Sequence, residues 1–151
     1  MSYLVSTTDN LNIFHKRNLC YSEAYSFLLK QYAEAIDEGK VFSITPWNND
    51  TCGLFYAKKD DKIIGVIVYD TDYNERKNNY ILGIIFASID KDYRNKGIYS
   101  KLYNQLEHWG KIEGFPVLGT LIHKNDSNFM ACMKSKGFTH IMYKTIKYLD
   151  R

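Results

Sequence analysis

A short basic stretch with a single glycine stands directly before a helix-like pattern in the middle of the chain. In DYRNKGIYSKLYNQL, Arg94 and Lys96 precede Gly97, and apolar residues then recur at helical spacing. A helix start exposes backbone N–H groups and the positive end of the peptide dipoles, so it favours an anion. Because Gly97 has no side chain, the backbone there can come close to a ligand. A phosphate or pyrophosphate is the group that such a turn would bind.

The same stretch is also compatible with a plain connection between a strand and a helix. It is not a P-loop, because the glycine spacing and the Lys-Ser or Lys-Thr pair of that motif are absent. It also lacks the three glycines of a dinucleotide-binding fingerprint. Taken alone, the motif leaves both interpretations open.

Hydrophobic periodicity predicts the elements that would hold this turn. Residues 3–7 fit a short strand, and after a polar TTDN the apolar positions recur with helical spacing. The clearest helix spans residues 22–38, with Ser22 as N-cap and Gly39 as its stop. Apolar runs predict strands over residues 54–59, 62–70, 80–90 and 115–123, a helix over 125–137, and one or two strands over 138–149.

Length and composition indicate one soluble α/β domain over residues 1–151. The net charge of +3 is mild and the basic residues are dispersed, which argues against a nucleic-acid partner. Three widely spaced cysteines suggest neither a disulfide framework nor a zinc site, so no metal is expected. The N-terminal residues do not resemble a signal peptide, and no run of about 18 apolar residues occurs. We therefore expect a cytoplasmic protein without a membrane partner.

Two stretches of the chain resemble a known family. IDKDYRNKGIYSKLYNQL resembles the acetyl-CoA signature of the GNAT superfamily of N-acetyltransferases, with Arg94, Gly97 and the position of Tyr99 in register. HKNDSNFMACMKSKGF is similar to a later helix of that family. The resemblance implies an α/β (α+β) fold with a mixed, mostly antiparallel central sheet flanked by helices, whose fourth and fifth strands splay apart.

The resemblance also implies acetyl-CoA as cosubstrate and assigns its binding residues. The turn and first helical residues would cradle the pyrophosphate, the strand end from Ala87 to Ile89 would pair with the pantetheine arm, and an asparagine of the later helix would contact the same arm. The residues implied are Ala87, Ile89, Arg94, Asn95, Lys96, Gly97, Ile98, Tyr99, Ser100, and Asn125 or Asn128.

The chain departs from the family pattern at several positions. Tyr99 replaces the small third residue of the turn, and Asp126 falls on the common asparagine position. Met133 stands where many members carry a tyrosine that protonates the leaving thiol. The stretch YILGIIFASI contains no acidic residue to match the strand glutamate that other members use as a base.

Acetyl transfer to an amine needs a neutral amine, so a base that acts through water is expected to help. Asp90, Asp70, Tyr69 and His123 are candidates, and each is equally compatible with an ordinary strand-end position. An amide N–H of the strand near Ile89 would polarise the thioester carbonyl, as it does in the family. The predicted function is acetyl transfer from acetyl-CoA to a primary amine of a small molecule or protein, by direct attack in a ternary complex; a homodimer is compatible with it. The alternative is a catalytically silent CoA-binding or protein-interaction module on the same fold.

Overall fold

The computed structural model describes residues 2–40, 47–74, 79–120 and 127–138. The chain divides into two compact units, Met1–Leu121 and Ile122–Arg151.

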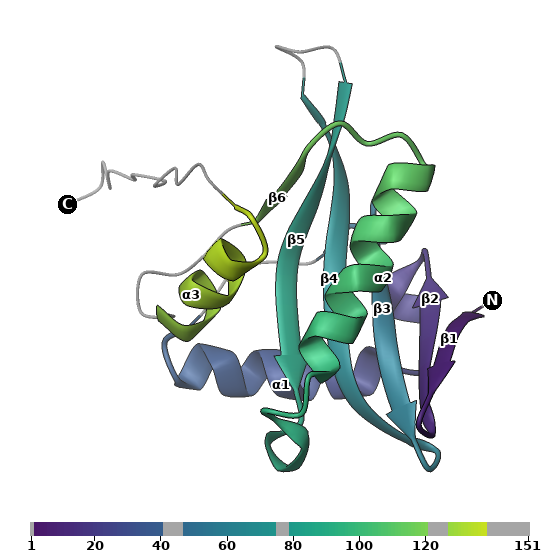
Figure 1. Cartoon of the computed structure of the whole chain (residues 1–151), viewed down its shortest axis with the longest axis vertical. Helices are drawn as coiled ribbons and strands as arrows, with labels where there is room; N and C mark the ends of the chain where they lie inside the picture. The colour runs from purple at the N-terminus through teal and green to yellow at the C-terminus, as the bar shows by residue number, and fades with distance from the viewer. Residues whose placement is uncertain (1, 41–46, 75–78, 121–126, 139–151) are drawn as a thin grey trace. The chain divides into compact units, whose positions relative to one another are not determined.

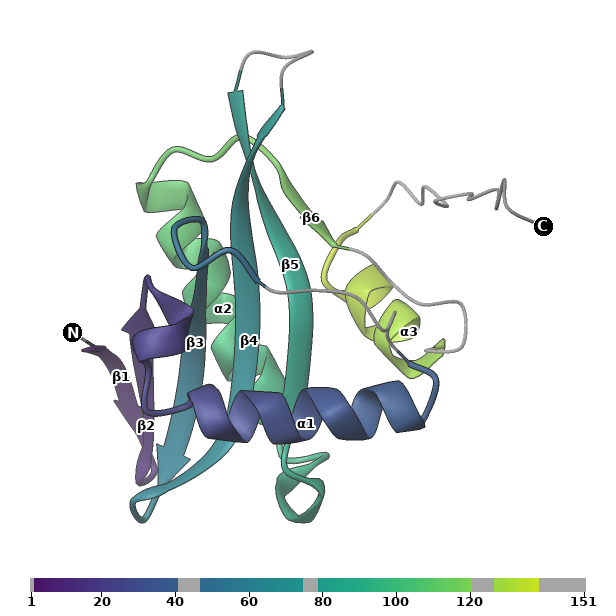
Figure 2. The same cartoon turned by 180° about the vertical axis from the view of Figure 1, so that it is seen from behind.

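The first unit is built on one six-stranded sheet with the order β1-β2-β3-β4-β5-β6. Figures 1 and 2 show helix α1 on one face of this sheet and helix α2 on the other. All neighbouring strands are antiparallel except β5 and β6, which are parallel. The elements are β1 (Tyr3–Thr8), β2 (Leu11–Lys16), α1 (Tyr25–Asp37), β3 (Cys52–Lys59), β4 (Lys62–Asn74), β5 (Asn79–Ile89), α2 (Ile98–Ile112) and β6 (Leu118–Thr120).

Strand β2 corrects the helical spacing expected after Asn10. Leu11, Ile13 and His15 are buried and alternate with less buried neighbours, which is the period of two of a strand. Asp9 and Asn10 both have positive φ and form the two-residue turn of the β1–β2 hairpin. The apolar residues in this stretch fit the period of a helix as well as that of a strand. Pairing with β1 in the hairpin makes the segment a strand.

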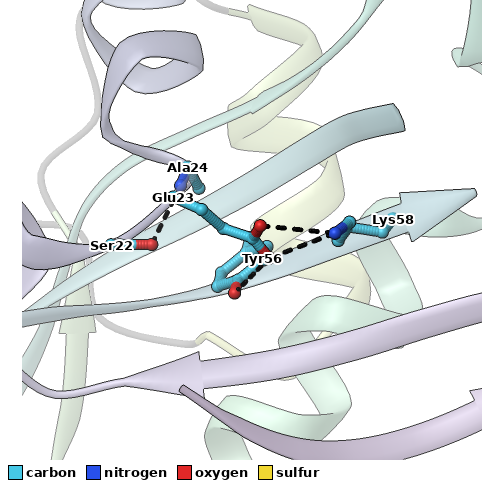
Figure 3. A network of polar contacts seen from close by, with 5 residues as sticks. All are labelled: Ser22, Glu23, Ala24, Tyr56 and Lys58. Carbon is cyan, nitrogen blue, oxygen red and sulfur yellow. Dashed lines mark hydrogen bonds and ion pairs between the residues drawn. The ribbon is translucent and has the colours of Figure 1, made fainter. Parts of the chain in front are cut away.

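Helix α1 begins at Tyr25, three residues later than predicted from the sequence, and ends at Asp37. Ser22 still serves the helix start, because its Oγ accepts a hydrogen bond from the Ala24 amide at 3.0 Å. Figure 3 shows how the same segment is tied to β3: Tyr56 Oη donates to Glu23 Oε1 at 2.8 Å, and Lys58 Nζ lies 3.3 Å from Glu23. These contacts fix the start of α1 over the sheet.

An apolar cluster fills the space between α1 and the sheet, and we call this side the α1 face. Its partly buried margin includes Phe14, Tyr32, Trp47 and Ile85. Its buried members are Leu19, Ala24, Leu28, Cys52, Leu54, Tyr56, Val66, Val68 and Phe86.

Helix α2 packs against the opposite side of the sheet, which we call the α2 face. Leu102 and Leu106 of α2 are fully buried, as their helical spacing predicted. Trp109 contacts the rings of His15, Phe55 and Tyr69. Helix α2 therefore lies across β2 to β5 and ends beside β2.

In the second unit, α3 (Ser127–Ser135) confirms the helix predicted there. Gly137, which has a φ of 93°, follows the C-terminus of this helix. The Gly137 amide donates to Lys134 O at 3.1 Å and the Phe138 amide to Met133 O at 3.2 Å, which is the Schellman arrangement. The final strands predicted over residues 138–149 lie almost wholly outside the described residues.

The predicted fold class is confirmed, since one mostly antiparallel sheet is combined with three α-helices in the described part of the chain. None of the described helices is long and apolar enough to cross a membrane.

Candidate active site

The turn between β5 and α2 combines a short 3₁₀ segment with two left-handed residues. β5 ends at Ile89, and Lys91–Tyr93 form the 3₁₀ segment. Asn95 has a φ of 61° and Gly97 a φ of 77°, after which α2 begins at Ile98 as predicted. A Cβ placed on Gly97 would meet no heavy atom within 4 Å. Glycine is therefore favoured here by the backbone conformation, and the space above it is open to a ligand.

The Arg94 side chain ties this turn to the end of β5. Its Nε donates to the Ile89 carbonyl at 2.9 Å. Lys96 Nζ reaches the Asp92 carbonyl at 3.5 Å and lies 5.4 Å from the centre of the Tyr93 ring. The turn thus carries basic side chains whose stems are held against its own backbone, close to the N-terminus of a 15-residue helix.

Beyond the turn, the outer edge of β5 is only partly covered. Its parallel pairing with β6 extends from Leu82 to Ile84, opposite Leu118 to Thr120. Thr120 Oγ1 donates to the Ile84 carbonyl at 3.1 Å and closes the paired stretch. Figure 1 shows the short β6 beside the upper part of the long strand β5. Between Ile84 and the turn that precedes α2, no described strand pairs with the outer edge of β5.

A β-bulge lies where the covered part of this edge ends. Val68 and Tyr69 are consecutive in β4, whereas their partners Phe86 and Ile84 are two residues apart in β5. Ile85 is therefore the extra residue, and both Ile85 and Phe86 pack against the cluster on the α1 face. The bulge shifts the alternation of side chains in the part of β5 that follows it.

After the bulge, Ser88 faces α1 and Ile89 faces α2. Ser88 Oγ donates to Gln31 Oε1 of α1 at 2.6 Å, and Ile89 Cδ1 lies close to Gly65 and α2. Ala87 lies between Phe86 and Ser88, which both face α1, so by alternation it faces α2 as Ile89 does. The Ser88–Gln31 contact was not predicted, because a single glutamine within an amphipathic helix gives no signal of a polar partner on a strand.

The structure brings most of the predicted cosubstrate residues together. Ala87 and Ile89 lie on the part of β5 whose outer edge no described strand pairs with, and the predicted residues from Arg94 to Ser100 form the turn and the first turn of α2. Asn128 is the second residue of α3 in the other unit, and Asn125 and His123 lie outside the described residues. The binding roles of all these residues stay predictions.

Asp90 is engaged at the beginning of the 3₁₀ segment. Its Oδ1 accepts from the Asp92 amide at 3.0 Å, and its Oδ2 lies 3.7 Å from Lys62 Nζ. Its carboxylate thus stabilises the start of the turn that precedes α2. The predicted role of Asp90 as a base stays a prediction.

Tyr69 is buried on the α2 face and shares a hydrogen bond with His15 Nε2 at 2.7 Å. Burial raises the pKa of Tyr69, and burial followed by the charge of Arg17 lowers the pKa of His15 to about 4. Both groups are therefore neutral near pH 7. The predicted catalytic role of Tyr69 stays a prediction.

Asp70, the next residue, points to the other side of the sheet. It pairs with Cys52 of β3 and lies two residues from Val68, both members of the α1-face cluster. Its Oδ1 is buried and has no hydrogen-bond partner among the described residues. In the described part of the chain, no three His, Cys, Asp or Glu side chains are grouped to hold a metal ion.

Comparison with known proteins agrees with this geometry. The model of the acetyltransferase (GNAT) family matches residues 13–138. None of the curated proteins compared matches the chain.

Solved structures with the same fold include several acetyltransferases. An aminoglycoside acetyltransferase from an uncultured soil metagenomic sample, in complex with sisomicin, is 20% identical, with 92% of this chain and 98% of that chain covered and a TM-score of 0.66. A ribosomal-protein-alanine N-acetyltransferase from Brucella melitensis biovar Abortus 2308 is 12% identical, with 92% and 99% covered and a TM-score of 0.71. The aminoglycoside N-acetyltransferase AAC(6')-Iy in complex with CoA is 15% identical, with 92% and 98% covered and a TM-score of 0.66. With the family model matching most of its length, the chain belongs to the GNAT family of acetyltransferases.

Proposed function

We propose that the protein transfers an acetyl group from acetyl-CoA to a primary amine, by direct attack within a ternary complex. The observation that carries the proposal is the left-handed turn at Asn95 and Gly97, which opens α2 directly beside the uncovered half of β5. A pyrophosphate and an extended arm are the two chemical groups that such neighbouring features fit.

The pyrophosphate would lie over the start of α2. The first N–H groups of a helix have no acceptor within the helix, and the macrodipole adds a partial positive charge. Lys96 supplies a full positive charge at the turn, and Gly97 leaves the approach free of side-chain atoms. This arrangement supports anion binding through the backbone.

The pantetheine arm would run along β5 from Ile89 towards the bulge. Peptide groups at a strand edge are strong hydrogen-bonding groups, and an extended chain that carries amides can satisfy them as a further strand would. An amide N–H in the same stretch would hold the thioester carbonyl and stabilise the charge that develops on its oxygen. The complex of AAC(6')-Iy with CoA is in keeping with this use of the fold.

In the reaction, the amine nitrogen attacks the thioester carbon. A C–N bond forms, the C–S bond breaks, and CoA departs as a thiolate that takes up the proton lost by the amine. A thiol with a reference pKa of about 8.5 is a good leaving group, so a tyrosine at the position of Met133 is not essential.

The test is the release of free CoA thiol from acetyl-CoA in the presence of spermidine, sisomicin or n-butylamine. Gly97→Glu places bulk and negative charge over the start of α2. Gly114→Glu is the matched control at the other end of the same helix, because Gly114 also has a positive φ, 83°, and open space around it.

We expect release that depends on the amine in the wild type and in Gly114→Glu, and its loss in Gly97→Glu. Binding of acetyl-CoA without release of thiol for any amine would contradict the proposal. That result would favour the silent CoA-binding module instead.

A further inference from the structure

Gln31 is a buried polar residue on the side of α1 that packs against the sheet. It belongs to a stripe with Ala24, Leu28 and Ala35, which recur at steps of three and four and are buried or half-buried. An apolar side chain is expected at such a position, because the burial of an amide is costly unless protein groups replace its hydrogen bonds to water. The Gln31 side chain therefore needs a specific partner on the sheet.

That partner is Ser88, in the part of β5 that follows the bulge. Ser88 Oγ donates to Gln31 Oε1 at 2.6 Å, and the two positions are 57 apart in the chain. Figure 2 shows α1 crossing β5 near the strand end that leads to the turn before α2. The hydrogen bond thus joins the helix on the α1 face to the last residues of β5.

The backbone groups of the residues on either side of Ser88 point away from β4. The Asp90 amide donates to the Ile64 carbonyl at 2.7 Å, so Asp90 and Ile64 form a hydrogen-bonded pair of the antiparallel ladder. Hydrogen-bonded and non-hydrogen-bonded pairs alternate along such a ladder. Ser88 therefore directs its own N–H and C=O towards β4, whereas Ala87 and Ile89 direct theirs towards the outer edge.

The outer edge beside Ser88 thus offers peptide groups to a ligand. The Ile89 carbonyl accepts from Arg94 Nε at 2.9 Å, so the turn already uses it. The Ala87 N–H and C=O and the Ile89 N–H remain, and no described strand pairs with them. Peptide groups are strong hydrogen-bonding groups, and the pantetheine arm of the proposed cosubstrate carries amides that suit them.

Ser88 lies between these outward groups, so its position affects the direction of both. Among the described strands only β4 pairs with β5 here, and the bulge at Ile85 interrupts the regular ladder. The hydrogen bond to Gln31 adds a second attachment, from the α1 face. A satisfied polar pair favours one arrangement of the chain, whereas two apolar residues of the same shape can give similar stability. A fixed orientation of the edge therefore explains the pair better than added stability does.

We propose that Gln31 is a positioning residue for the cosubstrate. Through Ser88, it fixes the outward peptide groups of Ala87 and Ile89 in the direction that the pantetheine arm requires. This inference rests on the proposed acetyltransferase function. In this role Gln31 needs no contact with the cosubstrate or with the reacting atoms.

The experiment measures acetyl-CoA binding by calorimetry and stability by urea unfolding in one set of variants. Gln31→Met and Ser88→Ala each remove the hydrogen bond and introduce no charge. Ser88→Thr keeps the hydroxyl and is the rescue variant. Tyr56→Phe is the matched control, because the Tyr56 hydroxyl also ties the segment before α1 to the sheet, through Glu23 at 2.8 Å, but from β3, two strands away from β5.

A second probe separates the arm from the rest of the cosubstrate. Adenosine 3′,5′-bisphosphate contains the nucleotide of CoA and lacks the pantetheine arm. Gln31→Met and Ser88→Ala should weaken acetyl-CoA binding about three- to tenfold, which is the contribution of one hydrogen bond, and should bind the nucleotide like the wild type.

The remaining variants test whether Gln31 and Ser88 act as a pair. The double variant should bind acetyl-CoA no more weakly than the weaker single variant, because both changes remove the same interaction. Ser88→Thr should bind acetyl-CoA like the wild type. Tyr56→Phe should lose stability and still bind acetyl-CoA like the wild type.

The inference is overturned if the wild type binds acetyl-CoA and Gln31→Met binds it equally well. It is also overturned if the variants lose as much affinity for the nucleotide as for acetyl-CoA, or if Tyr56→Phe weakens acetyl-CoA binding as much as Gln31→Met does. Failure of the proposed function has a different signature. Acetyl-CoA binding without thiol release would contradict that function alone, whereas a wild type that does not bind acetyl-CoA would contradict both.

Discussion

Tyr69 and Asp70 are consecutive residues of β4 that face opposite sides of the sheet, and their polar groups differ in how they are satisfied. On the α2 face, the Tyr69 hydroxyl meets His15 Nε2 at 2.7 Å. The rings of Phe55 and Trp109 enclose this pair. On the α1 face, Asp70 Oδ1 is equally inaccessible but has no partner in the described part of the chain.

The difference separates a buried hydroxyl whose hydrogen bond is complete from a buried carboxylate oxygen that has no partner at hydrogen-bond distance in the described residues. A buried polar pair whose hydrogen bonds are complete contributes to a unique packing, and its removal is costly. A buried acceptor without a donor costs free energy in the folded protein. We therefore expect removal of the Tyr69 hydroxyl to lower stability more than replacement of the Asp70 carboxylate by an amide.

The largest expected effect is the loss of stability on acidification, through His15. Its folded-state pKa of about 4 lies below the reference value of 6.5, so the unfolded chain binds a proton first as the pH falls. Stability is complete above pH 6.5 and falls progressively to pH 4, by about 3 kcal/mol at most. Urea unfolding across this range measures the slope. In His15→Phe the part of the slope due to His15 should vanish, and an unchanged slope would contradict a neutral buried histidine.

Gly53→Ala should be nearly as damaging. A Cβ at this position would collide with the Tyr69 hydroxyl and lie 2.8 Å from the Arg17 carbonyl oxygen, which belongs to the backbone. We expect a loss of about 2–3 kcal/mol in the free energy of unfolding, because the backbone cannot yield without strain. Gly83→Ala is the control: its Cβ would make an ordinary contact, and its stability should stay within about 0.5 kcal/mol of the wild type.

Tyr69→Phe removes the hydroxyl and leaves His15 Nε2 buried without its partner. The expected loss is about 1–2 kcal/mol by chemical denaturation. Acetyl-CoA binding should be unchanged, since the turn at Asn95 and Gly97 precedes the N-terminus of α2, whereas Tyr69 contacts Trp109 near its other end. Weaker acetyl-CoA binding in a folded Tyr69→Phe protein would contradict a purely structural role of the Tyr69 hydroxyl.

The smallest stability effect should come from Asp70→Asn. Asp70 Oδ1 has no hydrogen-bond partner at normal distance in the described residues, and an amide keeps the shape of the carboxyl group, so stability should stay within about 0.5 kcal/mol of the wild type or increase. Thermal unfolding followed by circular dichroism is sufficient to measure this. A large loss would show that Asp70 has a structural role, and the comparison with Tyr69 would then fail.

Local sequence patterns predicted the turn and the helices more accurately than the hydrogen bonds between side chains of distant segments. Gly97 and the apolar spacing after it placed the start of α2 correctly, because both signals act within a few residues. β2 was missed because its apolar residues match a helical period as well as a strand period, and only its pairing with β1 and β3 separates the two.

The contrast between Tyr69 and Asp70 required the structure. Alternation in a strand predicts that neighbours face opposite sides, but the partner of Tyr69 is 54 residues away in the chain. The position of Asp70 opposite Gly83 depends on the register between β4 and β5. Such long-range placement leaves no local signal in the sequence.

The most direct test of the account is calorimetric titration of acetyl-CoA into the wild type, Gly97→Glu and Gly114→Glu. The two glycines have similar positive φ values and equally open surroundings, but only Gly97 is at the helix start that would hold the pyrophosphate. We predict micromolar binding to the wild type and Gly114→Glu, and none to Gly97→Glu. An absence of binding to the wild type, or equal binding to all three, would contradict acetyl-CoA binding at the start of α2.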